Sequence, residues 1–211
     1  MTKIATAPTP AKIDPGLIQT AVEMVKSGGV ILFPARCMYG LGADAMNQAA
    51  VEKIFAMKQR DRGKPLLILA KDMEAVQQLA AHITENAKAI ARHFWPGDVT
   101  LVFQAKETLP ENLTAGSGKI GIRIPGHPLT AALVNALDSP ITGTSANISG
   151  APGCRRIDDI PRKIRDAADV FALDAGLLEG GPGSTVVDVT GTSPVVLREG
   201  VILKKDIFSI L

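Results

Sequence analysis

Apolar residues recur along the chain with two different spacings, which predict helices and strands in alternation. Positions three and four residues apart mark helices, and each predicted helix starts at a capping residue or a proline. The predicted helices start at Asp14-Pro15, Asn47, Asp72, Thr84 and Pro128. Short apolar runs predict buried strands over residues 30–33, 66–70, 99–104, 120–124, 141–142, 170–173, 185–189 and 195–198.

This order of elements predicts an α/β fold. Strands that alternate with amphipathic helices are typical of a sheet covered by helices. Fewer helices separate the later strands, so we expect a mixed sheet rather than a purely parallel one. The length of 211 residues fits one domain. We therefore expect a flexible tail over residues 1–12, where Pro8 and Pro10 lie, and a single domain over residues 13–211.

Composition narrows the classes of binding site. Hydrophobic residues make up 46% of the chain and charged residues 21%, the balance of a soluble globular protein. Aromatic residues are only 4%, which argues against a surface of stacked nucleic-acid bases. Because the formal net charge is only +2, any site for a polyanion must come from local clustering of cations.

The sequence shows no pattern typical of a metal-binding site or of a membrane-spanning segment. Cys37 and Cys154 are far apart, and the three histidines are scattered, so we expect neither a protein metal site nor a disulfide framework. No apolar run approaches the roughly 20 residues of a membrane span, and no hydrophobic segment near the start suggests a secretory signal. We expect a cytoplasmic protein that does not bind membranes.

The first candidate for chemistry is the basic segment over residues 58–65. Lys58, Arg60, Arg62 and Lys64 surround Asp61 at the end of a predicted helix. Such cations can simply complement the negative end of the helix. The segment also connects a helix to a buried strand, where ligand-binding loops are often placed, and arginine and lysine suit phosphate oxygens.

Four further segments combine hydroxyl groups or arginines with predicted strands. Residues 142–150 form a run rich in small hydroxylated side chains, which is either a polar turn or a phosphate site. Ser184 stands at the start of a predicted strand, and Arg198 at the end of another. Arg123 alternates with Ile122 and Ile124, so its side chain points to the opposite face of the sheet. The sequence contains neither a Walker A loop nor the serine elbow of hydrolases.

Taken in order, these segments resemble the YrdC/Sua5 family from about Asp14 to Gly200. Lys58-x-Arg60 together with Ser145-x-Asn147 matches the family's KxR and SxN signature. The further matching segments are residues 28–34, 39–45, 94–97, 100–102, 123–128, 184–188 and 197–200. Each motif is weak alone, but seven in the same order are specific.

The resemblance implies a twisted sheet curled around a basic cavity and a nucleotidyltransferase activity. Family members join L-threonine, bicarbonate and ATP, with Mg²⁺, into threonylcarbamoyl-AMP and pyrophosphate. The product serves the t6A modification of adenosine 37 in tRNA. The resemblance also implies contacts with tRNA or double-stranded RNA and with a downstream threonylcarbamoyl-transferase complex. Because positioning and electrostatics suffice for adenylation, we expect no catalytic nucleophile on the protein.

The same resemblance assigns residues to two substrates. ATP would be bound by a first set of polar and cationic side chains: Lys58, Arg60, Lys64, Ser145, Asn147 and Arg198. Threonine would contact Ala35, Arg123 and Ser184, with Arg123 pairing with its carboxylate.

The chain departs from the family in the region implied to bind the amino acid. Residues 35–38 read Ala-Arg-Cys-Met, where the family usually has a threonine, an acidic residue, a second threonine and a valine. Leu69 stands where a histidine is frequent. We expect Ala35 and Leu69 to make the amino-acid pocket more apolar and less selective for threonine.

Two alternatives remain open at this point. One is a paralogous carbamoyl-adenylating or nucleotide-hydrolysing enzyme with another amine substrate, which the change at residues 35–38 would permit. The other is a non-catalytic RNA-binding protein that uses the same basic cavity. Turnover of ATP separates the first from the second, and a steep salt dependence of RNA binding without turnover would favour the second.

Overall fold

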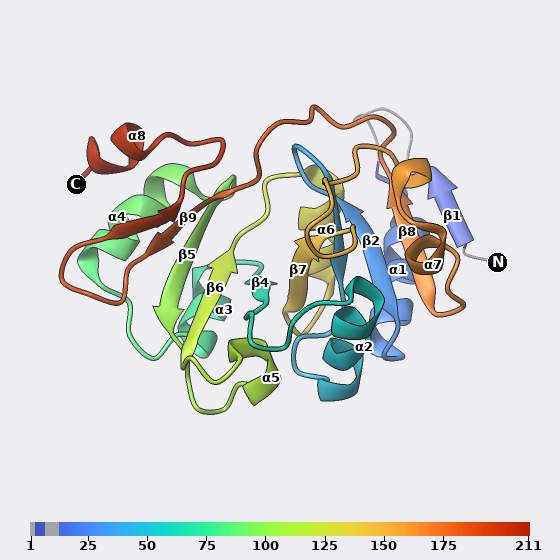
Figure 1. Cartoon of the computed structure of the whole chain (residues 1–211), viewed down its shortest axis with the longest axis horizontal. Coiled ribbons are helices and arrows are strands. Elements are labelled where there is room, and N and C mark those ends of the chain that lie inside the picture. Colours follow the sequence, from blue (N-terminus) through green and yellow to red (C-terminus); the bar gives the residue numbers. More distant parts are fainter. Residues whose placement is uncertain (1–2, 7–12) are drawn as a thin grey trace.

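The protein folds around one mixed sheet flanked by helices, as the computed structural model shows (Figure 1). The structure describes residues 3–6 and 13–211. The strands follow the order β1-β8-β2-β3-β7-β4-β6-β5-β9-β10 across the sheet. Their bounds are Lys3–Thr6 (β1), Val30–Pro34 (β2), Tyr39–Gly42 (β3), Leu67–Leu69 (β4), Val99–Gln104 (β5), Lys119–Arg123 (β6), Ile141–Ser145 (β7), Val170–Asp174 (β8), Thr185–Asp188 (β9) and Val195–Arg198 (β10).

Helices α1, α2, α3, α4 and α6 begin where the sequence predicts, whereas the short helices α5, α7 and α8 were not predicted. Their bounds are Pro15–Lys26 (α1), Gln48–Lys58 (α2), Met73–Leu79 (α3), Glu85–Phe94 (α4), Glu111–Thr114 (α5), Pro128–Ala136 (α6), Arg162–Arg165 (α7) and Lys204–Phe208 (α8). The side chains of Asp14, Asn47, Asp72 and Thr84 each accept a hydrogen bond from a backbone N–H in the first turn. These contacts satisfy donors that have no partner inside the helix. Among the described residues, no helix is long and apolar enough to cross a membrane.

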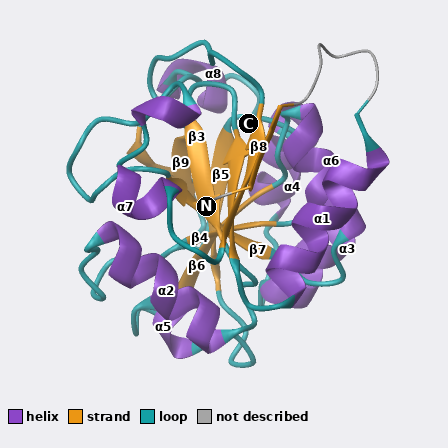
Figure 2. Cartoon of the chain, turned by 90° about the vertical axis from the view of Figure 1, so that its right-hand side faces the viewer, coloured by secondary structure: helices purple, strands orange, loops and turns teal. Residues whose placement is uncertain are grey.

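Two apolar layers cover the two faces of the sheet. The larger layer packs α2, α3, α4 and α7 against one face, and the smaller packs α1 and α6 against the other. Figure 2 shows α1 and α6 on one side of the sheet and α2 and α7 on the opposite side. The smaller layer contacts the half of the sheet around β2 and β8. The half around β5, β6 and β9 therefore has one face without a helical layer.

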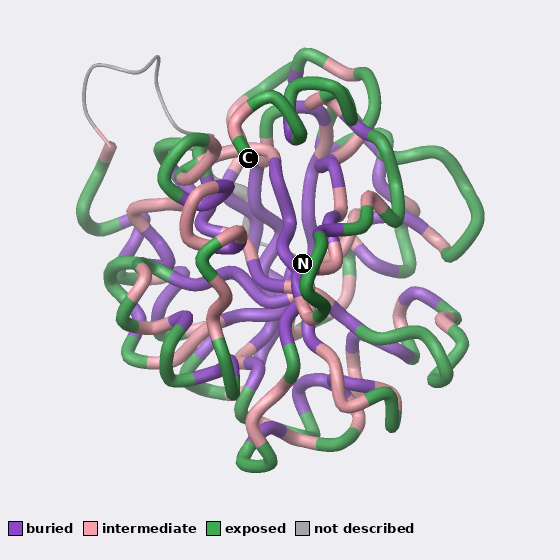
Figure 3. Tube along the Cα trace, turned by 90° about the vertical axis from the view of Figure 1, so that its left-hand side faces the viewer, coloured by how far each residue is buried: buried purple, intermediate pink, exposed green. Residues whose placement is uncertain are grey.

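The burial pattern along a strand shows whether helices cover one or both of its faces. All five residues of β2 are buried, because helices cover both of its faces. Residues of β6 instead alternate between half-buried and buried, since only one face meets the core. Figure 3 shows the buried segments of the chain gathered in the middle of the molecule and exposed segments around the outside.

Two strands differ from the prediction. Residues 39–42 were not predicted as a strand, because two glycines lower the strand propensity, yet they form β3 between β2 and β7. Within the predicted tail, Lys3–Thr6 pair in parallel with β8 as strand β1. That pairing joins segments more than 160 residues apart, which no local pattern reports. The other residues of the predicted tail, 1–2 and 7–12, lie outside the described residues.

Candidate active-site cleft

A cleft of about 590 Å³ opens on the uncovered face of the sheet. Its floor consists of residues that alternate with core residues along β4, β5, β6, β7 and β9. The floor residues are Leu67, Thr100, Gly121, Gly143 and Val186, and the intervening core residues include Ile68, Leu101, Ile122 and Val187. The period of two along each strand thus gives the sheet one packed face and one face that can receive a ligand.

Glycines allow the large apolar side chains of this face to lie flat on the sheet. A Cβ atom at Gly40 would lie 2.3 Å from the ring of Phe33, and one at Gly143 would lie 2.7 Å from Leu67. Such distances are far below van der Waals contact. Packing therefore requires glycine at these two strand positions. Gly40 of the matching segment 39–45 is explained by the lack of space for a Cβ atom.

Positive charge predominates in the cleft. The cations that line it are Arg36, Arg60, Lys119, Arg123 and Arg198, and the carboxylates are Asp98 and Asp188. Asp188 is already paired with Lys119 at 2.8 Å. Although the whole chain is nearly neutral, the cleft therefore attracts anions.

Lys58 and the turn after β7, which the family resemblance assigns to the same ATP site, form one hydrogen-bonded unit. The ammonium of Lys58, buried with 1% exposure, donates to the backbone oxygens of Ser145 and Asn147 and to Oδ1 of Asn147. Asn147 also accepts from the hydroxyl of Ser145 and donates to the backbone oxygen of Ala151. All three donors of the ammonium have acceptors, so Lys58 fixes the conformation of the turn.

Burial changes the acid–base properties of this unit. Desolvation, with a smaller effect of the positive charge of Arg60, lowers the pKa of Lys58 to about 8. Ser145 lines the cleft, whereas Lys58 and Asn147 lie behind the lining. We therefore regard Lys58 and Asn147 as positioning residues for the turn that presents Ser145.

Arg60 reaches the cleft from the basic segment. Its guanidinium donates to the backbone oxygens of Lys64 and Pro65, at 3.2 Å and 2.9 Å. Burial lowers the pKa of Arg60 below its ordinary value, although nearby Asp61 opposes the shift. Lys64 is exposed and contributes its backbone oxygen to Arg60 rather than a side chain to the cleft lining. The loop over residues 60–65 thus holds one guanidinium in place.

Arg198 and Ser184 meet on the opposite wall. The Arg198 guanidinium donates to the backbone oxygen of Ser184 at 2.8 Å and lies 3.4 Å from its hydroxyl. That hydroxyl is also 2.9 Å from the hydroxyl of Thr100 on β5. Both residues line the cleft, so the residue before β9 supplies a hydroxyl and the last residue of β10 a cation to the same site.

Arg123 is the most deeply placed cation of the cleft. Its side chain is 11% exposed, and one guanidinium nitrogen lies 3.9 Å from Asp98. Its Nε atom is buried and has no hydrogen-bond partner among the described residues. Desolvation lowers the pKa of Arg123, while Asp98 opposes that shift. A buried guanidinium with unused donors is suited to a carboxylate ligand.

Residues 35–38, which differ from the usual family pattern, lie beside Arg123. Arg36 pairs with Glu179 at 2.9 Å and lies 3.5 Å from the Asp98 carboxylate that also faces Arg123. Ala35 lines the cleft, as predicted. Leu69 does not: it is fully buried in the smaller apolar layer beside α6, so the prediction that it makes the pocket more apolar was wrong. Leu67, two residues earlier on the same face, does line the cleft.

The structure brings most of the predicted residues together. Ala35, Arg60, Arg123, Ser145, Ser184 and Arg198 line one cleft although they are scattered along the chain. Sequence reasoning missed Asp98 and Lys119. Lys119 could have been found, because it stands four residues before Arg123 on the same strand and so shares its face. Asp98 follows a Pro-Gly pair and carries no pattern of its own.

The donors present fit Mg²⁺ only as a companion of a phosphorylated substrate. Among residues 3–6 and 13–211, no group of three or more His, Cys, Asp or Glu side chains is placed to hold a metal ion. The two carboxylates of the cleft already face cations. Magnesium commonly takes one or two carboxylates together with substrate phosphates and water, so such a set suffices for an ion that enters with a nucleotide.

Comparison with known proteins places the chain in a family. The sequence model of Sua5, YciO and YrdC proteins, described as telomere recombination, matches residues 23–200. The threonylcarbamoyl-AMP synthases of Bacillus subtilis and Pyrococcus abyssi are 35% and 34% identical over 94% and 90% of this chain, covering 57% and 55% of those relatives. The structure of P. abyssi Sua5 complexed with L-threonine has a TM-score of 0.92 and 31% identity, and covers all of this chain and 61% of that chain.

The chain spans little more than half the length of these relatives. A putative threonylcarbamoyl-AMP synthase of Mycobacterium tuberculosis is 34% identical over 92% of this chain, and here the match covers 88% of the relative. The family model extends from within α1 to just beyond β10, and the motifs of the cleft lie within that range. The chain belongs to the Sua5/YciO/YrdC family.

Proposed function

We propose that the protein is an L-threonylcarbamoyladenylate synthase, a nucleotidyltransferase that supplies threonylcarbamoyl-AMP for the t6A modification of tRNA. The observation that carries the proposal is the convergence of Arg60, Ser145, Arg123, Ser184 and Arg198 on one basic cleft. Named relatives that synthesise threonylcarbamoyl-AMP support the choice of substrates.

Different side chains of the one cleft suit the two substrates. Arg60, Arg198 and the turn carrying Ser145 would bind the triphosphate of ATP, with Mg²⁺ entering as part of that substrate. Lys58 and Asn147 would hold the turn in shape. The sub-site around Arg123, Ser184 and Ala35 would receive threonine, with its carboxylate on the guanidinium of Arg123.

The chemistry proposed here needs positioning more than a protein nucleophile. Threonine and bicarbonate condense to a carbamate with loss of water. A carbamate oxygen then attacks the α-phosphorus of ATP, and the bond to the β-phosphate breaks to release pyrophosphate. Arg60 and Arg198 would stabilise the negative charge that develops on the phosphates, and the cleft holds the reacting groups in line.

The proposal is tested by incubating the protein with MgATP, bicarbonate and single amino acids, and measuring pyrophosphate and the adenylate formed. We expect threonine-dependent and bicarbonate-dependent release of pyrophosphate. Arg60→Ala should raise the KM for ATP, and Arg123→Ala should raise the KM for threonine. Turnover of ATP without a requirement for threonine would contradict the proposal.

A second candidate has a specific observation in its favour. Arg36 places a guanidinium beside Asp98 and Arg123, where the family usually has an acidic residue. That change could fit another amine substrate, in particular one with a second anionic group. The same assay separates the candidates, because pyrophosphate release with aspartate or another acidic amine, but not with threonine, would favour the paralogue. Transfer to tRNA by a downstream threonylcarbamoyl-transferase complex would follow only in the first case.

A further inference from the structure

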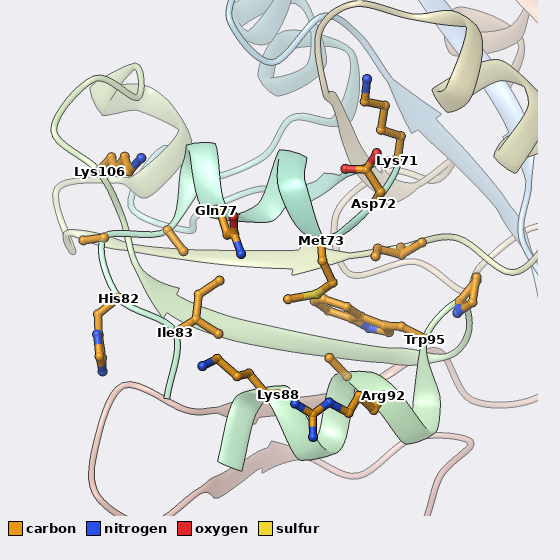
Figure 4. Close-up of a pocket in the computed structure, with 15 residues that line it drawn as sticks. Lys71, Asp72, Met73, Gln77, His82, Ile83, Lys88, Arg92, Trp95 and Lys106 are labelled. Carbon is orange, nitrogen blue, oxygen red and sulfur yellow. The ribbon is translucent and has the colours of Figure 1, made fainter. Parts of the chain in front are cut away.

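A second cavity, of about 780 Å³, lies between α3 and α4, away from the cleft (Figure 4). Both helices pack on the larger apolar layer, which covers the opposite face of the sheet. Met73, Ile83 and Trp95 form the half-buried apolar floor of this groove. Its volume is in the range of ligand-binding sites.

Cations surround the apolar floor. Lys71, Lys88, Arg92 and Lys106 line the groove together with a single carboxylate, that of Asp72. Within the described part of the chain, no ion pair involves Lys71, Arg92 or Lys106. These charges are therefore available to an external partner.

The remaining charges of the groove do little to neutralise these cations. The Asp72 carboxylate caps α3 by accepting from the backbone N–H of Ala75 at 2.7 Å. Lys88 pairs at 2.7 Å with Glu85, but that carboxylate is 81% exposed, and exposed pairs of this kind contribute little. A net positive rim around an apolar floor is complementary to an acidic, amphipathic occupant.

The spread of the cations indicates the size of the occupant. Figure 4 shows Lys106 and Lys71 toward opposite ends of the groove, with Lys88 and Arg92 along the α4 side and Met73 and Trp95 between them. A small molecule with one anionic group would engage only part of this rim. Several carboxylates spaced along an apolar face would engage all of it.

We propose that this groove docks an acidic amphipathic segment of a partner protein. Apolar side chains of the segment would pack on Met73, Ile83 and Trp95, and its carboxylates would face the rim cations, as in other complexes of a helix in a groove. The floor is aliphatic except for one tryptophan, which favours peptide side chains over stacked nucleic-acid bases. The proposal does not rest on the activity of the cleft.

The experiment uses the full chain and a random library of 16-residue peptides displayed on phage. Trp95 is the only tryptophan of the protein, so its fluorescence reports directly on the groove. We expect the selected peptides to be enriched in Asp and Glu interspersed with Leu, Ile and Phe. Synthetic versions should change the emission of Trp95, and their affinity should fall as salt rises.

Reversing the charge of rim residues tests whether the selected peptides bind in this groove. The double variant Lys88→Glu/Arg92→Glu should weaken the affinity for the selected peptides at least tenfold. The matched double variant Arg162→Glu/Lys163→Glu, on exposed positions of α7, makes the same change in net charge and should alter affinity less than twofold. A third variant, Met73→Glu, should abolish binding by placing a carboxylate in the apolar floor.

Several results would overturn the proposal. Selected peptides without acidic enrichment, an unchanged Trp95 emission, or equal affinity for the Lys88/Arg92 variant would each do so. A single-stranded oligouridine that perturbs Trp95, and loses affinity for the same variant while peptides have no effect, would reassign the groove to nucleic acid. Thermal unfolding and MgATP binding of each variant verify that it is folded.

Discussion

At the scale of single residues, Lys58 holds a buried charge against three oxygen acceptors. It can donate three hydrogen bonds only as an ammonium. Because burial lowers its pKa to about 8, the proton is lost in a range where an exposed lysine would keep it. We expect the KM for ATP to rise as the pH increases from 7 to 9, since the turn that presents Ser145 loosens.

The stability of the fold should not follow the same trend. The folded pKa of Lys58 lies below its ordinary value of 10.5, so between about pH 8 and that value the unfolded chain binds more protons. The contribution of this group to the free energy of unfolding therefore becomes more favourable as the pH rises.

Lys58→Met should remove the pH dependence of the KM for ATP. It should also lower the free energy of unfolding by roughly 1–3 kcal/mol, because it leaves buried acceptors unpaired. An unchanged pH profile in that variant would contradict the role given to Lys58.

Arg198 gives a second residue-scale prediction. Its guanidinium makes one close hydrogen bond, to the backbone of Ser184, from an exposed edge strand. Arg198→Ala should lower the free energy of unfolding by only about 1 kcal/mol, but weaken ATP binding roughly 10- to 100-fold through the loss of a charge-assisted contact. Calorimetric titration with ATP and urea unfolding measure the two effects. A large loss of stability with normal ATP affinity would make Arg198 a structural residue.

Ala35 sets the expected selectivity of the amino-acid sub-site. It lines the cleft near Arg123 and offers no hydrogen bond to a threonine hydroxyl. An apolar pocket discriminates between isosteres by only about a hundredfold. We therefore expect weak rejection of serine and valine, and Ala35→Thr should sharpen selectivity for threonine in competition assays. Rejection by several thousandfold in the natural protein would show that other residues supply the missing contact.

At the scale of elements, the packing of β3 against β2 requires a glycine at position 40. Since the ring of Phe33 occupies the space above Gly40, Gly40→Ala should lower the free energy of unfolding by about 1–3 kcal/mol through overpacking. Gly191→Ala is the matched control, because the nearest atom to its new Cβ would lie 3.8 Å away. Urea unfolding compares the two, and the double variant Gly40→Ala/Phe33→Leu should recover part of the loss. Equal stability of Gly40→Ala and the natural protein would be evidence against this packing.

At the scale of the whole molecule, the cleft draws on strands from both halves of the sheet. Ligands that bind only the folded state stabilise it, and at 100 times the Kd the gain is about 2.7 kcal/mol. For a chain of this length this corresponds to a rise in Tm of roughly 5–11 °C. We expect such a shift with MgATP by scanning calorimetry. Arg60→Ala should reduce the shift with MgATP but keep a shift with threonine, and loss of both would indicate a folding defect.

Local signals in the sequence determined much of the fold. Helix starts at Asp14, Asn47, Asp72 and Thr84 were predictable because a cap is a contact between near neighbours in the chain. Apolar runs marked the central strands, since burial requires them wherever the chain folds. The motifs from Lys58 to Arg198 were sufficient to indicate the family, and five of the site residues predicted from them line the cleft: Arg60, Arg123, Ser145, Ser184 and Arg198.

The tertiary structure alone decided what depends on contacts distant in sequence. It made a strand of the glycine-rich β3, added β1 to the edge of the sheet, and placed Leu69 in the core while Leu67 faces the cleft. It also buried Lys58 behind the turn and placed Asp98 between two arginines. Strand pairing and helix cover, rather than the identity of a residue, determine which face of a strand meets a core and which meets a ligand.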